Sequence, residues 1–225
     1  MKILKDAIKR GAKALSEHDS KLLLAEFGIP VTGEAIAKTE DEAVRAAAGI
    51  GYPVVMKGSG EKLSHKTEMN LVALDVRNDA EVREIFRRFT SRKDVEVKEV
   101  LVQQMVKGDR ELVCGLTRDP QFGPCVMFGL GGIFTGILED IAFRVAPLTK
   151  LDAMEMMEDI RAKKILGPVR GKAPVDREVL ANILITLGKI GLENDAIKEI
   201  DINPLKVIDG KPVAVDALVV LGGGK

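Results

Sequence analysis

The segment IKEIDINPLKVIDGKPVAVDALV, residues 197–219, alternates apolar and polar residues on both sides of the dipeptide Asp209-Gly210. Asp-Gly is favoured in two-residue type I′ turns, so the segment is predicted to fold into a β-hairpin. Counting back from the turn places Asn203 opposite Asp216 as a non-hydrogen-bonded pair, the class in which side chains lie closer together. The end of the chain is therefore predicted to bring two polar side chains from different strands together.

One face of this predicted hairpin carries oxygen-bearing side chains. Glu199, Asp201 and Asn203 alternate along one strand and therefore share a face. With Asp216 they form a set of hard oxygen ligands, which suits Mg²⁺ with a bound phosphate. A solvated hairpin face explains the spacing equally well, and a bulge at Pro204, which has no backbone N–H, would shift the register.

Composition excludes several classes of protein. Lys plus Arg and Asp plus Glu both number 34 in 225 residues, so the net charge is zero, which argues against nucleic acid or an anionic membrane as the main partner. Hydrophobic residues make up 46% of the chain, enough for a packed core. Two cysteines without metal-ligand spacing and no signal-peptide core predict a reducing, cytoplasmic location. The uncharged stretch 120–138 is interpreted as a buried strand running into a glycine loop.

Helical and strand patterns alternate along the chain, which predicts an α+β fold in two lobes that meet near residue 104. We expect an N-terminal helical segment over 1–20, a first lobe over 21–103, a second lobe over 104–221 and a disordered tail over 222–225. The predicted helices are 2–15, a second ending at Gly28, 40–49, 78–90, 150–161 and 176–193; the strands before the hairpin are 54–57, 70–76, 97–106, 111–116 and 141–145. Capping boxes are predicted at 39–42 and 78–81.

A lysine stands at the end of an apolar strand and precedes small residues. Lys57 follows Val54-Val55-Met56, and Gly58, Ser59 and Gly60 come next. Lys57 would supply a point charge for a phosphate, and the small residues would let backbone N–H groups approach it. The pattern is not a Walker loop, and a lysine extending from a strand end to solvent explains Lys57 by itself.

His65 lies eight residues beyond Lys57, next to Ser64, Lys66 and Thr67. A neutral imidazole near phosphate-binding cations can accept a phosphoryl group at nitrogen. An isolated histidine is more often a polar residue with an ordinary partner. A further motif, 129–132, reads Gly-Leu-Gly-Gly and lacks the third glycine of a Rossmann fingerprint.

Taken together, these segments resemble the nucleotide-binding subunit of ADP-forming acetyl-CoA synthetases, an acyl-CoA ligase family related to succinyl-CoA synthetase. The resemblance covers nearly the whole chain. The motifs that carry it are VVMK at 54–57, HKT at 65–67, RDPQFGP at 118–124, VMFGLGGIF at 126–134 and EIDINPL at 199–205.

The resemblance implies an ATP-grasp fold with ATP or ADP held between the two lobes. It implies that Lys57 contacts the phosphates, together with Gly58, Ser59, Ser64 and Lys66 around it. It also implies that Gln103, Gln104, Met105 and Val106 form the linker along the adenine and that Glu111 contacts the nucleotide. Asn203 and Asp216, beside Asp201, match the Mg²⁺ ligands.

A partner is implied in the same way. In this family a CoA-binding α subunit forms an acyl phosphate, its histidine takes the phosphoryl group, and a second histidine relays it to ADP. His65 stands at that second position, which makes it the candidate catalytic residue. The resemblance suggests a hetero-oligomer, such as a heterotetramer, of the two subunits.

Two departures from the family pattern keep other functions open. The family continues after the histidine through a glycine pair, where this chain has Asn70 and Leu71, and Gly136 stands where the glycine motif usually reaches a glutamate. One alternative is a stand-alone ATP-grasp carboxylate ligase or kinase. Another is a nucleotide-sensing subunit that has lost phosphoryl transfer.

Overall fold

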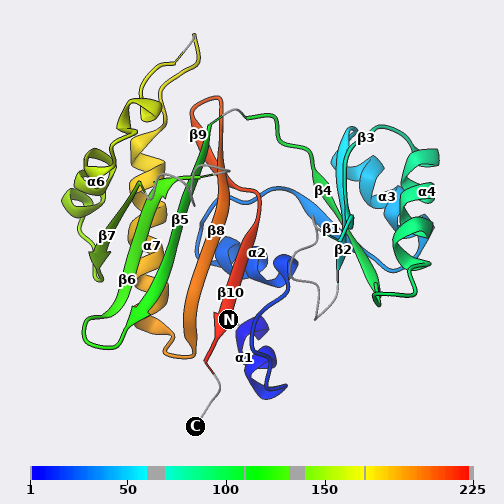
Figure 1. Ribbon diagram of the computed structural model, residues 1–225, viewed down its shortest axis with the longest axis horizontal. Coiled ribbons are helices and arrows are strands. Elements are labelled where there is room, and N and C mark those ends of the chain that lie inside the picture. The colour runs from blue at the N-terminus through cyan, green and yellow to red at the C-terminus, as the bar shows by residue number, and fades with distance from the viewer. Residues whose placement is uncertain (1, 60–68, 109, 132–139, 170, 223–225) are drawn as a thin grey trace. The chain divides into compact units, whose positions relative to one another are not determined.

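A computed structural model describes residues 2–59, 69–108, 110–131, 140–169 and 171–222 (Figure 1). The chain forms two compact units, one of Met1–Val31 with Lys107–Lys225 and one of Thr32–Val106. Residues 21–31, which the sequence analysis placed in the first lobe, pack in the unit that contains 107–225. Leu23, Leu24 and Ile29 belong to that unit's hydrophobic core, which explains the difference. The tail predicted at 222–225 lies, except for its first residue, outside the described residues.

The unit of residues 32–106 contains an antiparallel sheet with the strand order β1-β4-β2-β3. Its strands are β1 (Glu34–Ala37), β2 (Val54–Ser59), β3 (Val72–Val76) and β4 (Glu99–Gln104), and its helices are α3 (Glu40–Ile50) and α4 (Asp79–Thr90). Val54, Met56, Val100 and Val102 share one core with side chains of both helices, so the helices cover this face of the sheet. Alternation then directs Lys57 to the opposite face.

Polar caps fix the start of both helices. The Thr39 hydroxyl accepts the Glu42 N–H at 3.2 Å, and the Asn78 side chain accepts the Glu81 N–H at 3.0 Å. The second hydrogen bond of each predicted capping box, in which the glutamate would accept the N–H of the cap residue itself, is not the one observed. The Glu42 and Glu81 carboxylates accept the N–H of the residue before the cap, at 2.7 and 2.8 Å, because the chain enters each helix with that N–H within reach.

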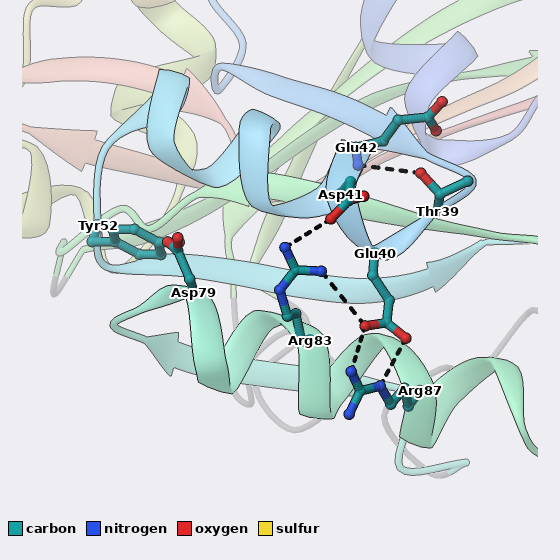
Figure 2. A network of polar contacts seen from close by, with 8 residues as sticks. All are labelled: Thr39, Glu40, Asp41, Glu42, Tyr52, Asp79, Arg83 and Arg87. Atoms are coloured by element: carbon teal, nitrogen blue, oxygen red, sulfur yellow. Dashed lines mark hydrogen bonds and ion pairs between the residues drawn. The ribbon is translucent and has the colours of Figure 1, made fainter.

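Ion pairs join α3 to α4 on the surface (Figure 2). The Arg87 guanidinium donates to both carboxylate oxygens of Glu40, at 2.7 and 2.8 Å, and Arg83 lies 2.7 Å from Asp41. The Tyr52 hydroxyl donates to Asp79 at 2.7 Å. These exposed contacts link the two helices, which pack on the sheet through their apolar side chains.

The second unit contains a sheet with the strand order β10-β8-β5-β6-β7, and β9 pairs with β8. Its strands are β5 (Glu111–Asp119), β6 (Gly123–Leu130), β7 (Ile141–Val145), β8 (Ile197–Ile208), β9 (Lys211–Ala214) and β10 (Ala217–Leu221). Its helices are α1 (Lys2–Lys9), α2 (Glu17–Glu26), α6 (Lys150–Asp159) and α7 (Arg177–Glu193), with a 3₁₀ turn at Lys163–Leu166. Side chains of all four α-helices share one apolar core with the sheet, and Figure 1 shows α7 behind β5 and β6.

Several element boundaries differ from the predictions. The helix expected over 2–15 ends at Lys9, because Gly11 adopts a left-handed conformation with φ +68° and the chain then bridges to β10 through Ala14 and Val220. The four-residue strand β1 was not predicted, since it is too short for a clear alternation. Among the described residues no helix is both long enough and apolar enough to cross a membrane.

Candidate functional site

The hairpin at the end of the chain has the predicted register. Asp201, on the far side of Pro204 from the Asp209-Gly210 turn, pairs with Leu218. This pair keeps the register of the pairs nearer the turn, so no bulge intervenes at Pro204. Asn203 stands opposite Asp216 as predicted, and its N–H donates to the Asp216 carbonyl at 3.2 Å. The prediction of a non-hydrogen-bonded pair was therefore wrong. Pro204 has no N–H, so the ladder is irregular at this point.

The side chains of β8 alternate as predicted. Ile200 and Ile202 are buried in the core of this unit, while Glu199 is exposed and Asp201 and Asn203 are partly exposed. The three polar residues thus lie on the face of β8 that points away from the core.

The surroundings of Asp201 disfavour the charged form of its carboxyl group. Burial, and to a lesser extent the charges of Glu199 and Asp216, raise the pKa of Asp201 to about 6. A bound cation would relieve both effects, since it replaces lost solvation and offsets the neighbouring charges. No group of three His, Cys, Asp or Glu side chains within the described part of the chain could hold a metal by itself. A cation at this face would therefore also need the Asn203 amide and oxygen atoms of a ligand, and the three metal ligands stay a prediction.

A glycine on the neighbouring strand allows this arrangement. Gly115 of β5 pairs with Asp201, and a Cβ at Gly115 would lie 2.2 Å from the Ile200 carbonyl oxygen. Any side chain there would push β5 and β8 apart. The sequence analysis did not identify Gly115, although a lone glycine inside an alternating strand is a signal of close backbone approach.

Lys57 lies inside β2 and not at its end. The strand continues through Gly58 and Ser59, which were predicted as loop residues. It continues because Gly58 and Ser59 both pair with β4 and the Gly58 N–H donates to the Leu71 carbonyl at 2.8 Å. The Ser59 hydroxyl also donates to the Glu99 carboxylate at 3.3 Å. Lys57 is 8% exposed on the face opposite the helices. A buried lysine on this face fits the predicted role in binding an anion, and that role stays a prediction.

The predicted linker begins later than expected. Gln103 and Gln104 are the last residues of β4, where Gln103 pairs with Glu34 and is 1% exposed. Gln104, at the end of this interior strand, pairs with Val54 of β2, and its N–H donates to the Gly33 carbonyl at 2.8 Å. Only Met105 and Val106 follow the strand before the second unit begins.

Glu111 opens β5 and already has a charged neighbour. It pairs across the sheet with Lys206 of β8, whose Nζ lies 3.1 Å from a Glu111 carboxylate oxygen. Lys206 was not identified from the sequence, because the pairing of β5 with β8 joins segments far apart in the chain. Contact of Glu111 with a nucleotide remains a prediction.

The remaining predicted residues lie outside the described part of the chain. These are His65 with its neighbours Ser64 and Lys66, and the glycine at 136. Their roles stay predictions from the sequence.

Comparison with known proteins identifies the family. A family model described as ATP-grasp domain matches residues 6–221. The chain is 44% identical over 214 residues to the acetate–CoA ligase [ADP-forming] I subunit beta of Pyrococcus furiosus, covering 93% of this chain and 92% of that protein.

Two solved structures of dinucleotide forming acetyl-coenzyme A synthetase 1 from Ca. Korarchaeum cryptofilum are similar. One, in complex with coenzyme A, Ca-AMPCP and HgCl⁺, has a TM-score of 0.94 and 41% identity, covering 98% of this chain and 99% of that one. The other, with coenzyme A and Mg-AMPPCP and its phosphohistidine segment pointing towards the nucleotide binding site, has a TM-score of 0.87 and 40% identity, with the same coverage. The predicted α+β ATP-grasp fold is confirmed, and the chain belongs to the ATP-grasp family of β subunits of ADP-forming acetate–CoA ligases.

Proposed function

We propose that this chain is the nucleotide-binding subunit of an ADP-forming acyl-CoA synthetase. With a CoA-binding α partner it would interconvert acyl-CoA, ADP and phosphate with the free acid, ATP and CoA. The observation that carries the proposal is the match to a β subunit over nearly the full length of both chains. The two free, buried cysteines are consistent with a reducing, cytoplasmic location for this activity.

A magnesium ion bound with the nucleotide fits the outward face of β8. Asp201, whose pKa is raised to about 6, lies on that face with Asn203, and Asp216 stands opposite Asn203. Two carboxylates and one amide are oxygen donors of the kind that Mg²⁺ prefers, and phosphate oxygens complete such sites. When bound, Mg²⁺ neutralises phosphate charge.

Residues of both units would hold the nucleotide. Lys57, which is buried on the sheet face opposite the helices, would bind the phosphates of ATP or ADP as a point charge. Met105 and Val106, together with Gln103 and Gln104 at the end of β4, would line the adenine. Glu111 would contact the nucleotide, with Lys206 fixing its carboxylate.

His65 would carry the phosphoryl group. One imidazole nitrogen forms a bond to phosphorus as the bond from phosphorus to the partner's histidine breaks. In the next step the new N–P bond breaks while a terminal oxygen of ADP bonds to phosphorus, which yields ATP and returns the imidazole to its neutral form. Such transfers depend mainly on positioning and on neutralising phosphate charge.

Reconstitution tests this function. The purified chain, given acetate or another acid, ATP and CoA, is expected to form no acyl-CoA, and addition of the CoA-binding partner is expected to give product and ADP. Acyl-CoA formed by the chain alone would instead indicate a stand-alone ligase. An assembled pair that is inactive with every acid tested, yet binds ATP, would indicate a nucleotide sensor.

A further inference from the structure

The N-terminal segment packs along β10 and along the turn that precedes it. The Leu15 N–H donates to the Val219 carbonyl at 2.9 Å, and the Val219 N–H donates to the Ser20 hydroxyl at 3.1 Å. On the other side of the turn, the Ala214 N–H donates to the Pro30 carbonyl at 2.9 Å. Residues 15–30 therefore hold the chain on both sides of Val215 and Asp216.

A buried lysine contacts the backbone of the segment at Val215 and Asp216, between β9 and β10. Lys21 of α2 is 1% exposed, and its ammonium group lies 3.0 Å from the Val215 carbonyl and 3.3 Å from a Glu17 carboxylate oxygen. Glu17 lies one helical turn before Lys21 and is also buried. Removing an ammonium and a carboxylate from water is costly, and an apolar pair of similar size is often as stable. Stability alone is therefore a weak reason for a charged pair at this place.

The contact of Lys21 with the Val215 carbonyl affects the next residue in the chain, Asp216. Val215 directly precedes Asp216, whose backbone carbonyl accepts the Asn203 N–H at 3.2 Å. A charge-assisted hydrogen bond to the Val215 carbonyl restrains the peptide plane between the two residues. It thereby restrains the direction in which the Asp216 side chain leaves the backbone.

We infer that Lys21 is a positioning residue for the metal site, which holds Asp216 opposite Asn203 through the Val215 carbonyl, with Glu17 orienting its ammonium group. The inference rests on the proposed function, since it assumes that Asp216 takes part in binding Mg²⁺ with the nucleotide. It assigns helix α2 a role in the site, although α2 carries none of the predicted ligands.

The test compares the buried pair Glu17 and Lys21 with a control arginine elsewhere in the same unit. The double variant Glu17→Gln/Lys21→Met removes both charges, so that neither is left buried alone. Arg118→Met is the matched control. The Arg118 guanidinium donates to the carbonyls of Ile197, Gly191 and Asn194, so its loss perturbs the same unit without touching the turn at Val215.

Calorimetry measures ADP binding at a series of Mg²⁺ concentrations and again in EDTA. The double variant is expected to need about tenfold more Mg²⁺ for half-saturation, as expected for a lost charged hydrogen bond, with unchanged ADP affinity in EDTA. Arg118→Met is expected to lower the Tm and leave the Mg²⁺ midpoint unchanged. A double variant with a normal Mg²⁺ midpoint would overturn the inference.

A coupling measurement separates positioning from general damage. In the background of Asp216→Asn, the double variant is expected to cause no further shift of the Mg²⁺ midpoint, because its effect passes through Asp216. Shifts that simply add would contradict the inference. If the double variant does not fold, Lys21→Arg takes its place. It is expected to raise the Mg²⁺ concentration at half-saturation severalfold, because the larger guanidinium displaces the Val215 carbonyl. If the ADP affinity of the wild-type protein does not depend on the Mg²⁺ concentration, the proposed function is refuted, and the inference with it.

Discussion

Replacing Asp201 by asparagine is predicted to stabilise the metal-free protein at neutral pH. Burial and the charges of Glu199 and Asp216 together raise the pKa of Asp201 to about 6. The ionised carboxylate is therefore unfavourable in the folded state when no cation is present. Asparagine has nearly the same shape without the charge. The same substitution should weaken Mg²⁺-dependent nucleotide binding, so stability and function are expected to change in opposite directions.

The magnitude follows from proton linkage. An unfolded aspartate has a pKa of about 3.9, so between about pH 4 and pH 6 the folded protein binds more protons than the unfolded chain, and stability falls as the pH rises through this window. A shift of about two pKa units corresponds to about 3 kcal/mol at most. Asp201 is only partly buried, and solvent screening reduces this to about 1–2 kcal/mol. The gain is expected in full at pH 7.5 and is expected to vanish near pH 4.

Urea unfolding in EDTA at pH 7.5 and pH 4 measures this gain. Asp209→Asn is the matched control, because it makes the same substitution in the same hairpin at the exposed turn, where asparagine also tolerates the φ of 48°. The control is expected to change the free energy of unfolding by less than about 0.5 kcal/mol at either pH. An Asp201→Asn protein that is less stable at pH 7.5, or whose gain is the same at both pH values, would refute the reasoning.

Three further outcomes are expected. Gly115→Ala should lower the free energy of unfolding by more than about 2 kcal/mol in urea titrations, because its Cβ would lie 2.2 Å from the Ile200 carbonyl oxygen. Arg87→Met should destabilise the protein more at pH 7 than at acidic pH. The hydrogen bond from Arg87 lowers the pKa of Glu40, so its contribution is present above the unfolded pKa of about 4.5 and is lost as the pH falls through the folded value. Burial raises the pKa of the Cys114 thiol, so it should react with a thiol reagent at pH 8 only after unfolding in urea.

Each outcome has a control or a contradicting result. Gly49→Ala in α3, where an added Cβ meets nothing within 4 Å, should be neutral or stabilising, and an equal loss at Gly49 and Gly115 would contradict the steric argument. Arg88→Met, which removes a guanidinium lying 5.3 Å from the Phe89 ring centre, should have an effect independent of pH between 3 and 7. Rapid labelling of Cys114 in native protein would show that its strand opens readily.

Local patterns predicted those parts of the site that depend on neighbouring residues in sequence. The Asp209-Gly210 turn was enough to align Asn203 with Asp216, because a two-residue hairpin determines its own register. The alternation of β8 likewise predicted which face carries Asp201. One detail failed at Pro204, where a missing N–H changes the hydrogen-bond pattern without shifting the register.

Contacts between distant segments could not be predicted in this way. The pairing of Glu111 with Lys206 and the close approach of Gly115 to Ile200 both depend on β5 lying beside β8, which no local pattern specifies. The burial of Lys21 depends on α2 packing against β10. The sequence analysis did not identify Lys21, because no local pattern distinguishes a buried lysine of α2 from an exposed one.

Phosphorylation of His65 tests the central claim most directly. The chain, assembled with its CoA-binding partner, is incubated with γ-³²P-ATP and Mg²⁺, and the labelled residue of this chain is identified after rapid quenching in alkali. An acid-labile, base-stable phosphoryl group on His65, lost in His65→Ala while ADP binding persists, is the expected result. Full turnover of His65→Ala, or no label on this chain at any stage of turnover, would contradict the relay and leave a protein that only holds the nucleotide.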